Sequence, residues 1–162
     1  MDGHNFMSAN GRVDYKELEE YMKKVQKSLS PMEIEKFIEN CARELAARLL
    51  AKVIKRTPVG QYPASSGKKG GTLRRGWTGG KRASAVGHAR TLKVHHYSKY
   101  YVIEIENPTE YAIWVEYGHR TPNHEGWVEG RFMMTISAEE INEVAPRILE
   151  RKLKQKLEEA FA

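Results

Sequence analysis

The residue types best suited to chemistry gather in one stretch of the chain, YAIWVEYGHRTPNHEGWVEGRF, at positions 111–132. Within it, Glu116, His119 and His124 supply the oxygen and nitrogen donors that metal ions bind. Their spacing, however, matches no standard ligand pattern, and a solvated turn is the commoner origin of such a group. The sequence therefore favours a turn over a metal site here.

Other signatures of catalysis or of cofactor binding are missing from the sequence. The adjacent His95 and His96 fall on an expected strand, where neighbouring side chains point to opposite faces and cannot hold one ion together. The nearest glycine pattern, GKKGGTLRRG, lacks the order of a phosphate-binding loop. Cys41 is the only cysteine and lies on the apolar side of an expected helix, which suits a buried, unreactive thiol. We predict no enzymatic activity, no cofactor and no metal site.

Positive charge is concentrated in one part of the chain. Residues 52–99 contain twelve Lys or Arg and no acid, so this stretch carries +12 and the rest of the chain −6. Such asymmetry is typical of proteins that meet a polyanion or an acidic protein, although a solvated loop would look the same. The candidate contacts for DNA or for an acidic partner are Lys68, Lys69, Arg74, Arg75, Lys81 and Arg82.

Two interpretations of these basic residues stay open. With Trp77 among them as a ring for stacking on a base, they could grip a nucleic acid. No nucleic-acid-binding motif accompanies them, so such binding would be weak in sequence preference and strongly salt-dependent. Alternatively, they belong to a flexible arm that docks on an acidic neighbour.

The elements that must position these groups begin with two helices. Residues 14–25 have helical spacing, and Ser30-Pro31-Met32-Glu33 combines a capping box with proline at the first helical position. From there an apolar stripe continues to Ile54, and Thr57-Pro58 ends the helix because the residue before proline avoids helical geometry. Residues 1–12 are expected to be disordered.

The middle of the chain is expected to be looser. Residues 57–90 hold eight of the thirteen glycines and predict an extended basic loop, with a short edge strand at 72–78. Alternation over 91–97 and 101–106 predicts an antiparallel hairpin. A capping signature then predicts a short helix over 108–117, closed by Gly118 and followed by loop.

The last element is a helix that begins near Arg131 or Ser137 and runs to Phe161. Pro146 should kink or split it near Val144. Its apolar residues recur every four positions. On a helix with 3.6 residues per turn, each such step moves the next side chain about 40° around the helix axis. The stripe therefore wraps around the helix and can touch two neighbours. These residues are Ile141, Ala145, Leu149, Leu153, Leu157 and Phe161.

The fold class predicted from these elements is α+β. A single domain over residues 13–162 contains a long N-terminal helix, a small antiparallel sheet with a long basic Gly-rich loop, a short helix and a kinked C-terminal helix. No apolar run approaches the roughly 20 residues of a membrane span, and the first residues lack a signal-peptide core. We expect a soluble protein made in the cytoplasm.

Aromatic rings recur at steps of three on one side of the expected short helix. Such rings most often belong to a core, but a short helix in a small domain has little room to bury them, and Trp and Tyr are favoured anchors at interfaces. We predict a subunit or partner interface formed by these rings and by later apolar residues: Tyr111, Trp114, Tyr117, Trp127, Phe132, Leu149, Leu153 and Leu157.

Four motifs in a fixed order resemble the tail-component, or neck, family of long-tailed phages and defective prophages. They are TPVG at 57–60, TLRRGW at 72–77, IENPTEYAIWVEYGHR at 105–120 and GWVEGRFMMTIS at 126–137. The sequence departs from the family pattern near Gly71, after an insertion-like QYPASSGKKG, and at Gly76, where the family has serine before the tryptophan.

This resemblance implies a structural virion protein without catalysis or cofactor. It implies a homo-oligomeric ring, six-fold or twelve-fold, at the head–tail connector (neck) or in a tail-completion or terminator layer, between portal and tail. Expected partners are copies of itself, connector- or portal-side proteins, tail-tube or terminator proteins, and DNA in the lumen, in a virion assembled in the bacterial host. A stand-alone basic module that binds nucleic acid without sequence specificity is the alternative.

Overall fold

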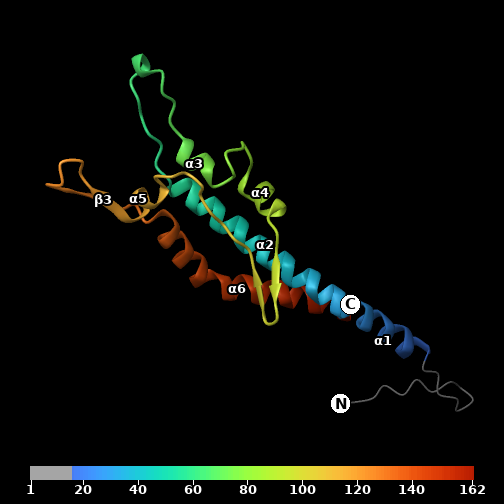
Figure 1. The fold of residues 1–162 in the computed structure, drawn as a ribbon. Coiled ribbons are helices and arrows are strands. Elements are labelled where there is room, and N and C mark those ends of the chain that lie inside the picture. The colour runs from blue at the N-terminus through green and yellow to red at the C-terminus, as the bar shows by residue number, and fades with distance from the viewer. Residues whose placement is uncertain (1–15) are drawn as a thin grey trace, which may run out of the picture.

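Helices dominate the structure, a computed structural model that describes residues 16–162 (Figure 1). The expected disorder of residues 1–12 lies outside the described residues. Both sheets are two-stranded and antiparallel, which confirms the predicted α+β class. In chain order the elements are α1 (Lys16–Ser28), α2 (Pro31–Arg56), the 3-10 helix η1 (Ala64–Ser66), α3 (Thr72–Gly76), α4 (Ala85–Thr91), β1 (His95–Tyr97), β2 (Tyr100–Val102), α5 (Ala112–Tyr117), β3 (Gly118–Arg120), β4 (Trp127–Glu129) and α6 (Met133–Phe161).

Helix α2 begins and ends as its sequence predicts. The N–H of Glu33 donates to Ser30 Oγ at 3.3 Å, and Pro31 occupies the first turn, where its missing N–H costs nothing. Glu33 does not complete the capping box, because its carboxylate lies against Lys36 at 3.2 Å and Lys156 of α6 at 3.6 Å. At the other end Thr57 is extended, with φ −66° and ψ 125°.

The hydrophobic core lies against the C-terminal half of α2. Ile103 and Ile105, from the extended chain after β2, are half-buried against it. The predicted burial of Cys41 is confirmed, and this burial raises the pKa of the thiol through desolvation. The buried members of the core, drawn from α2, α3, α4 and the first turn of α6, are Ala46, Leu50, Val53, Leu73, Trp77, Ala89 and Met133.

The stretch 57–90 is more structured than the extended loop that its glycines predict. The edge strand expected at 72–78 is wrong: these residues form α3 and its C-terminal cap, which turn Leu73 and Trp77 into the core. Helix α4 is a second unexpected element, opened by the N–H of Gly87 donating to Ser84 Oγ at 3.0 Å. Within this stretch, residues 58–71, here called the basic arm, project from the body, with η1 at the tip (Figure 1).

The predicted hairpin exists but is shorter than expected. Strands β1 and β2 pair only from His95↔Val102 to Tyr97↔Tyr100, because the residues before His95 leave α4 and those after Val102 pack on the core without a strand partner. A second hairpin, β3–β4, replaces part of the loop expected after residue 118. Gly118, at φ 83°, turns the chain directly from α5 into β3, and a Cβ there would lie 2.4 Å from the Val128 carbonyl oxygen.

Helix α5 starts four residues later than the capping signature predicts. Asn107 Oδ1 accepts from the Thr109 N–H at 3.1 Å, which makes a turn, while Asn107 Nδ2 donates to the Leu73 carbonyl oxygen at 2.7 Å. The amide thus ties the extended chain to α3. Gly76 fits beneath it, since an added Cβ would meet Asn107 Oδ1 at 2.1 Å.

Helix α6 is continuous through Pro146, so the proline bends it without splitting it, and Figure 1 shows the change of direction. Ile141 is buried against the body, but Leu149 and the later members of the four-residue stripe are exposed. Ile148, seven residues after Ile141 and so on nearly the same side of the helix, is buried, because the four-residue stripe drifts away from that side. No helix among residues 16–162 is both long enough and apolar enough to cross a membrane.

Ion pairs join α2 to α6 along their length. Glu140 binds both Lys52 and Arg56 at 2.7 Å, and Glu44 binds Lys152 of α6 as well as Arg48, the latter at 2.8 Å. The hydrogen bond from Lys152 is the largest influence that holds the pKa of Glu44 below its ordinary value of 4.5.

A pH dependence follows from Glu44. Its folded pKa is depressed, so its stabilising contribution is complete above pH 4.5 and is lost as the pH falls through the lower folded value. We expect Glu44→Gln to lower the free energy of unfolding near neutral pH by about 1 kcal/mol or less. On acidification, the free energy of unfolding of this variant should fall less than that of the wild-type protein. Urea titrations at several pH values test this. Glu158→Gln is the control, since its Lys154 partner is 3.9 Å away, and equal acid profiles for the two variants would contradict the prediction.

Candidate interaction surfaces

Five exposed rings, which we call the aromatic surface, lie on α5 and its N-terminal cap, on β4 and on the residue before α6. Each ring is between 39% and 58% exposed. Tyr117 and Phe132 meet edge to face with centroids 6.4 Å apart, and Trp114 lies 6.3 Å from the His119 ring. The members are Tyr111, Trp114, Tyr117, Trp127 and Phe132.

The structure does not unite the eight apolar residues that the sequence grouped as one interface. Leu149, Leu153 and Leu157 are exposed on the second half of α6, and Leu149 already lies roughly 24 Å along the helix from Met133 at 1.5 Å per residue. We call these three the leucine stripe. The molecule therefore carries two separate apolar surfaces instead of one.

Glu116 is a positioning residue that sequence reasoning placed only in a hypothetical metal group. Its side chain is buried, and its carboxylate accepts from the Met134 and Thr135 N–H groups at 3.0 and 2.9 Å and from Thr135 Oγ1 at 2.8 Å. Helix α6 follows Phe132, at φ 47°, and has no side-chain cap of its own. Glu116 caps it from α5, where the positive end of the helix dipole favours a carboxylate. Across residues 16–162, no three His, Cys, Asp or Glu lie close enough to hold a metal ion.

We expect Glu116→Ala to lower the free energy of unfolding by about 2 kcal/mol, because it leaves three donors at a partly buried helix terminus without an acceptor. Glu116→Gln keeps one acceptor oxygen and should lose about half as much. Urea denaturation followed by circular dichroism measures both. A loss below about 0.5 kcal/mol for the alanine variant would show that the cap is dispensable.

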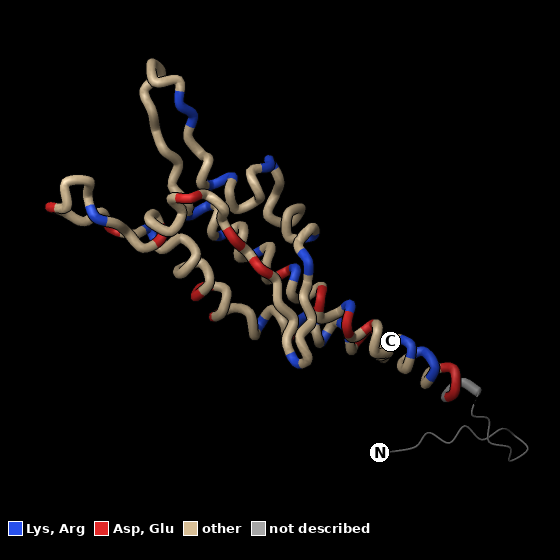
Figure 2. The backbone as a smooth tube through the Cα atoms, viewed as in Figure 1, with Lys and Arg blue, Asp and Glu red and all other residues tan. Residues whose placement is uncertain are grey.

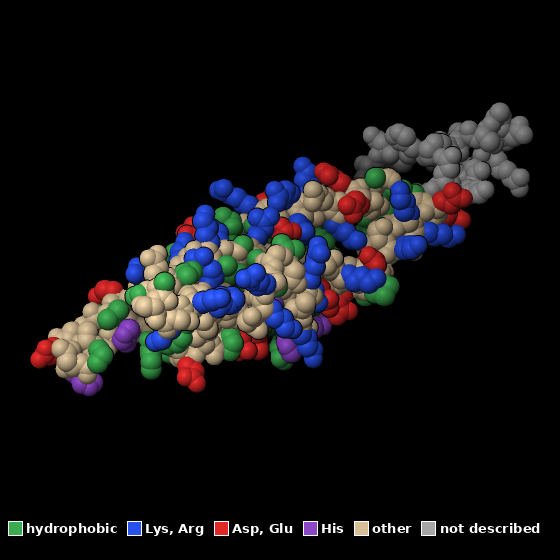
Figure 3. Space-filling view, turned by 90° about the horizontal axis from the view of Figure 1, so that it is seen from above, with side chains coloured by type: hydrophobic (Ala, Val, Ile, Leu, Met, Phe, Trp, Pro, Cys, Tyr) green, Lys and Arg blue, Asp and Glu red, His purple; other side chains and the backbone are tan. Residues whose placement is uncertain are grey.

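The six basic candidates are not equivalent. Lys68 and Lys69 are exposed on the basic arm, and Arg75, Lys81 and Arg82 are exposed near α3 and the turn that leads to α4. Figure 2 marks these positions along the backbone, and Figure 3 shows Lys and Arg side chains spread over the middle of the face seen from above. Five of the six are therefore accessible to a partner.

Arg74 and Trp77 serve the fold. The Arg74 guanidinium donates to the Thr57 carbonyl oxygen at 2.7 and 3.1 Å, at the end of α2. Trp77 is only 6% exposed, and its Nε1–H donates to Thr57 Oγ1 at 2.7 Å. The hypothesis that Trp77 stacks on a base is wrong, because its faces are packed in the core. These contacts also explain why TPVG and TLRRGW occur in one chain: the first motif ends α2 and the second packs on that end.

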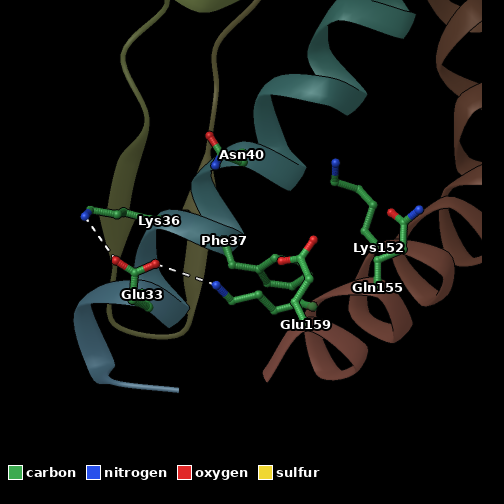
Figure 4. Close-up of a pocket in the computed structure, with 8 residues that line it drawn as sticks. Glu33, Lys36, Phe37, Asn40, Lys152, Gln155 and Glu159 are labelled. Atoms are coloured by element: carbon green, nitrogen blue, oxygen red, sulfur yellow. Dashed lines mark hydrogen bonds and ion pairs between the residues drawn. The ribbon is translucent and has the colours of Figure 1, made fainter. Parts of the chain in front are cut away.

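A cleft of about 340 Å³ lies between the N-terminal part of α2 and the C-terminal part of α6 (Figure 4). Phe37 lies within it, and Glu33 stands at its rim between Lys36 and Lys156. The hydrogen bond from Lys36 is the largest influence that lowers the pKa of Glu33. Because these charges neutralise one another, we interpret the cleft as part of the contact between the two helices.

The described residues thus define a protein with exposed apolar surfaces and a basic projection on a helical α+β scaffold, an arrangement suited to binding other macromolecules. The profile of the family described as "Bacteriophage HK97-gp10, putative tail-component" matches residues 16–118, and the protein belongs to this family. As a structural component of the phage tail, it has its place in the virion and contacts other phage structural proteins. The match spans α1 to α5 and ends before the GWVEGRFMMTIS motif. No curated protein and no solved structure matches the chain.

Proposed function

We propose that this tail component assembles as a homo-oligomeric ring at the head–tail connector (neck) or in a tail-completion or terminator layer at the tail end. The observation that carries the proposal is the aromatic surface. A monomeric protein rarely leaves five large rings exposed within residues 111–132, and exposed rings of this kind mark contacts with other proteins.

The energetics favour a protein partner for this surface. The rings are already about half covered, so completing the burial of one is worth roughly 1–1.5 kcal/mol. Several rings together contribute several kcal/mol toward the loss of translational and rotational freedom on association. The Glu116 cap and the β3–β4 hairpin hold the surface in place, so little further order is needed on binding.

A ring is favoured over a simple dimer because the two apolar surfaces differ. In a cyclic ring each subunit contacts its neighbours through two unlike patches, whereas a two-fold dimer buries the same patch twice. The aromatic surface and the leucine stripe suit the two sides of such a contact, in a six-fold or twelve-fold ring. The exposed lysines and arginines would face DNA in the lumen or an acidic neighbour.

Electron microscopy of purified particles tests this proposal, together with light scattering of the isolated protein over a range of concentrations. We expect a ring of this protein between portal and tail, and self-association in solution or on the preceding ring of the particle. Particles that lack the protein, or that hold it as isolated monomers, would contradict the proposal.

A further inference from the structure

The basic arm has almost no support from its own subunit. Every residue from Pro58 to Lys69 is exposed, and the described hydrogen bonds within the arm lie at its tip, where the Ser66 N–H donates to the Pro63 carbonyl oxygen at 2.9 Å. The Lys68 ammonium lies 5.9 Å from the centre of the Tyr62 ring, which joins the two legs loosely. The two legs approach at Gly60 and Gly70 without a backbone hydrogen bond between them. A projection of this kind gains order by docking on something outside the subunit, because its backbone groups otherwise bond only to water.

A second unsupported segment lies on the body of the molecule. Residues 103–110, here called the acidic edge, continue from β2 in extended form. Ile103 and Ile105 face the core, and the glutamates between and after them are exposed. Among residues 16–162, no backbone hydrogen bond is made to residues 103–106. Within the same described part of the chain, the exposed glutamates of the edge form no ion pair; they are Glu104, Glu106 and Glu110.

The acidic edge is open to an incoming chain. A cleft of about 300 Å³ runs beside it, with Leu92 and Ile105 in its lining. Glu104 and Glu106 border this cleft together with Lys93, which forms no ion pair with either of them among the described residues. An extended segment with unpaired N–H and C=O groups can accept another strand by backbone hydrogen bonding, and the side chains around it select which strand binds.

We propose that the basic arm of one copy lies along the acidic edge of the next copy, with Lys68 and Lys69 facing Glu104 and Glu106. The arm carries two positive charges and no acid, and the edge carries negative charges without a described basic partner. Since each copy has both an arm and an edge, the contact is heterologous and passes from subunit to subunit. This inference rests on the proposed function only in requiring self-association.

Charge reversal on each side tests the pairing. We expect Lys68→Glu/Lys69→Glu to weaken self-association about tenfold, because acidic groups then meet acidic groups, and Glu104→Lys/Glu106→Lys to weaken it equally. Mixing the two variants should restore assembly, because in an alternating oligomer every arm again meets an edge of opposite charge. The matched control is Lys81→Glu/Arg82→Glu, an exposed basic pair outside the arm, which should assemble normally. Sedimentation of the purified proteins and their incorporation into particles are the readouts.

The outcomes separate this inference from the ring itself. If the wild-type protein assembles and the arm variant fails but the edge variant does not, the arm contacts something other than the acidic edge. If mixing restores nothing, the arm and the edge do not pair. In either case the inference is wrong, while the ring stands. If neither variant is impaired, the inference is also wrong. A wild-type protein that stays monomeric both in solution and in particles overturns the inference and the ring together.

Discussion

Trp77→Ala will lower the free energy of unfolding by about 3–5 kcal/mol, the usual cost of truncating a buried tryptophan. The ring is 6% exposed, packs in the core with α2 and α4, and donates to Thr57 Oγ1 at the point where α2 ends. Its loss would leave a cavity and would also detach α3 from the end of α2. Urea denaturation followed by circular dichroism measures the change.

The conservative variant Trp77→Phe separates packing from hydrogen bonding. It keeps an aromatic ring in the core and loses the Nε1–H donor, so we expect a smaller loss of about 1–2 kcal/mol. If Trp77→Ala instead cost less than about 1 kcal/mol, the ring would not be part of the core, and its use as a stacking platform for a base would return as an explanation.

Trp114→Ala, in contrast to Trp77→Ala, will leave the subunit folded and will impair its assembly. The side chain is 58% exposed, so the free energy of unfolding should change by no more than about 0.5–1 kcal/mol. As an anchor of an interface, its truncation should cost at least about 2 kcal/mol of association, roughly a thirtyfold weaker contact. Light scattering on dilution and the yield of complete particles measure that loss.

Tyr97→Ala is the matched control for Trp114, because Tyr97 is 55% exposed but lies on the β1–β2 hairpin, outside the aromatic surface. It should leave assembly unchanged. Two results would count against the interface: a purified Trp114→Ala protein that unfolds, which would make the ring part of the core, or one that assembles as well as the control.

Local patterns in the sequence predicted the elements whose causes are local. Ser30 and Pro31 open α2, Thr57 before proline ends it, and Gly118 ends α5, because capping and dihedral preferences act over a few neighbouring residues. The repeat of apolar residues likewise predicted two long helices and the burial of Cys41. The order of four short motifs was enough to indicate the family, although it did not indicate what each residue in those motifs does.

The tertiary structure decided which of the chemically similar residues serve the fold and which face solvent. Trp77 and Trp114 have the same side chain, and each lies at or within a short helix, but the first is buried beside Thr57 and the second is exposed. Arg74 and Arg75 are adjacent, yet the first caps α2 and the second is free of the core. The physical reason is that burial depends on what packs from distant parts of the chain. Glu116 caps a helix that begins seventeen residues later, and no pattern within a few residues of it records that contact.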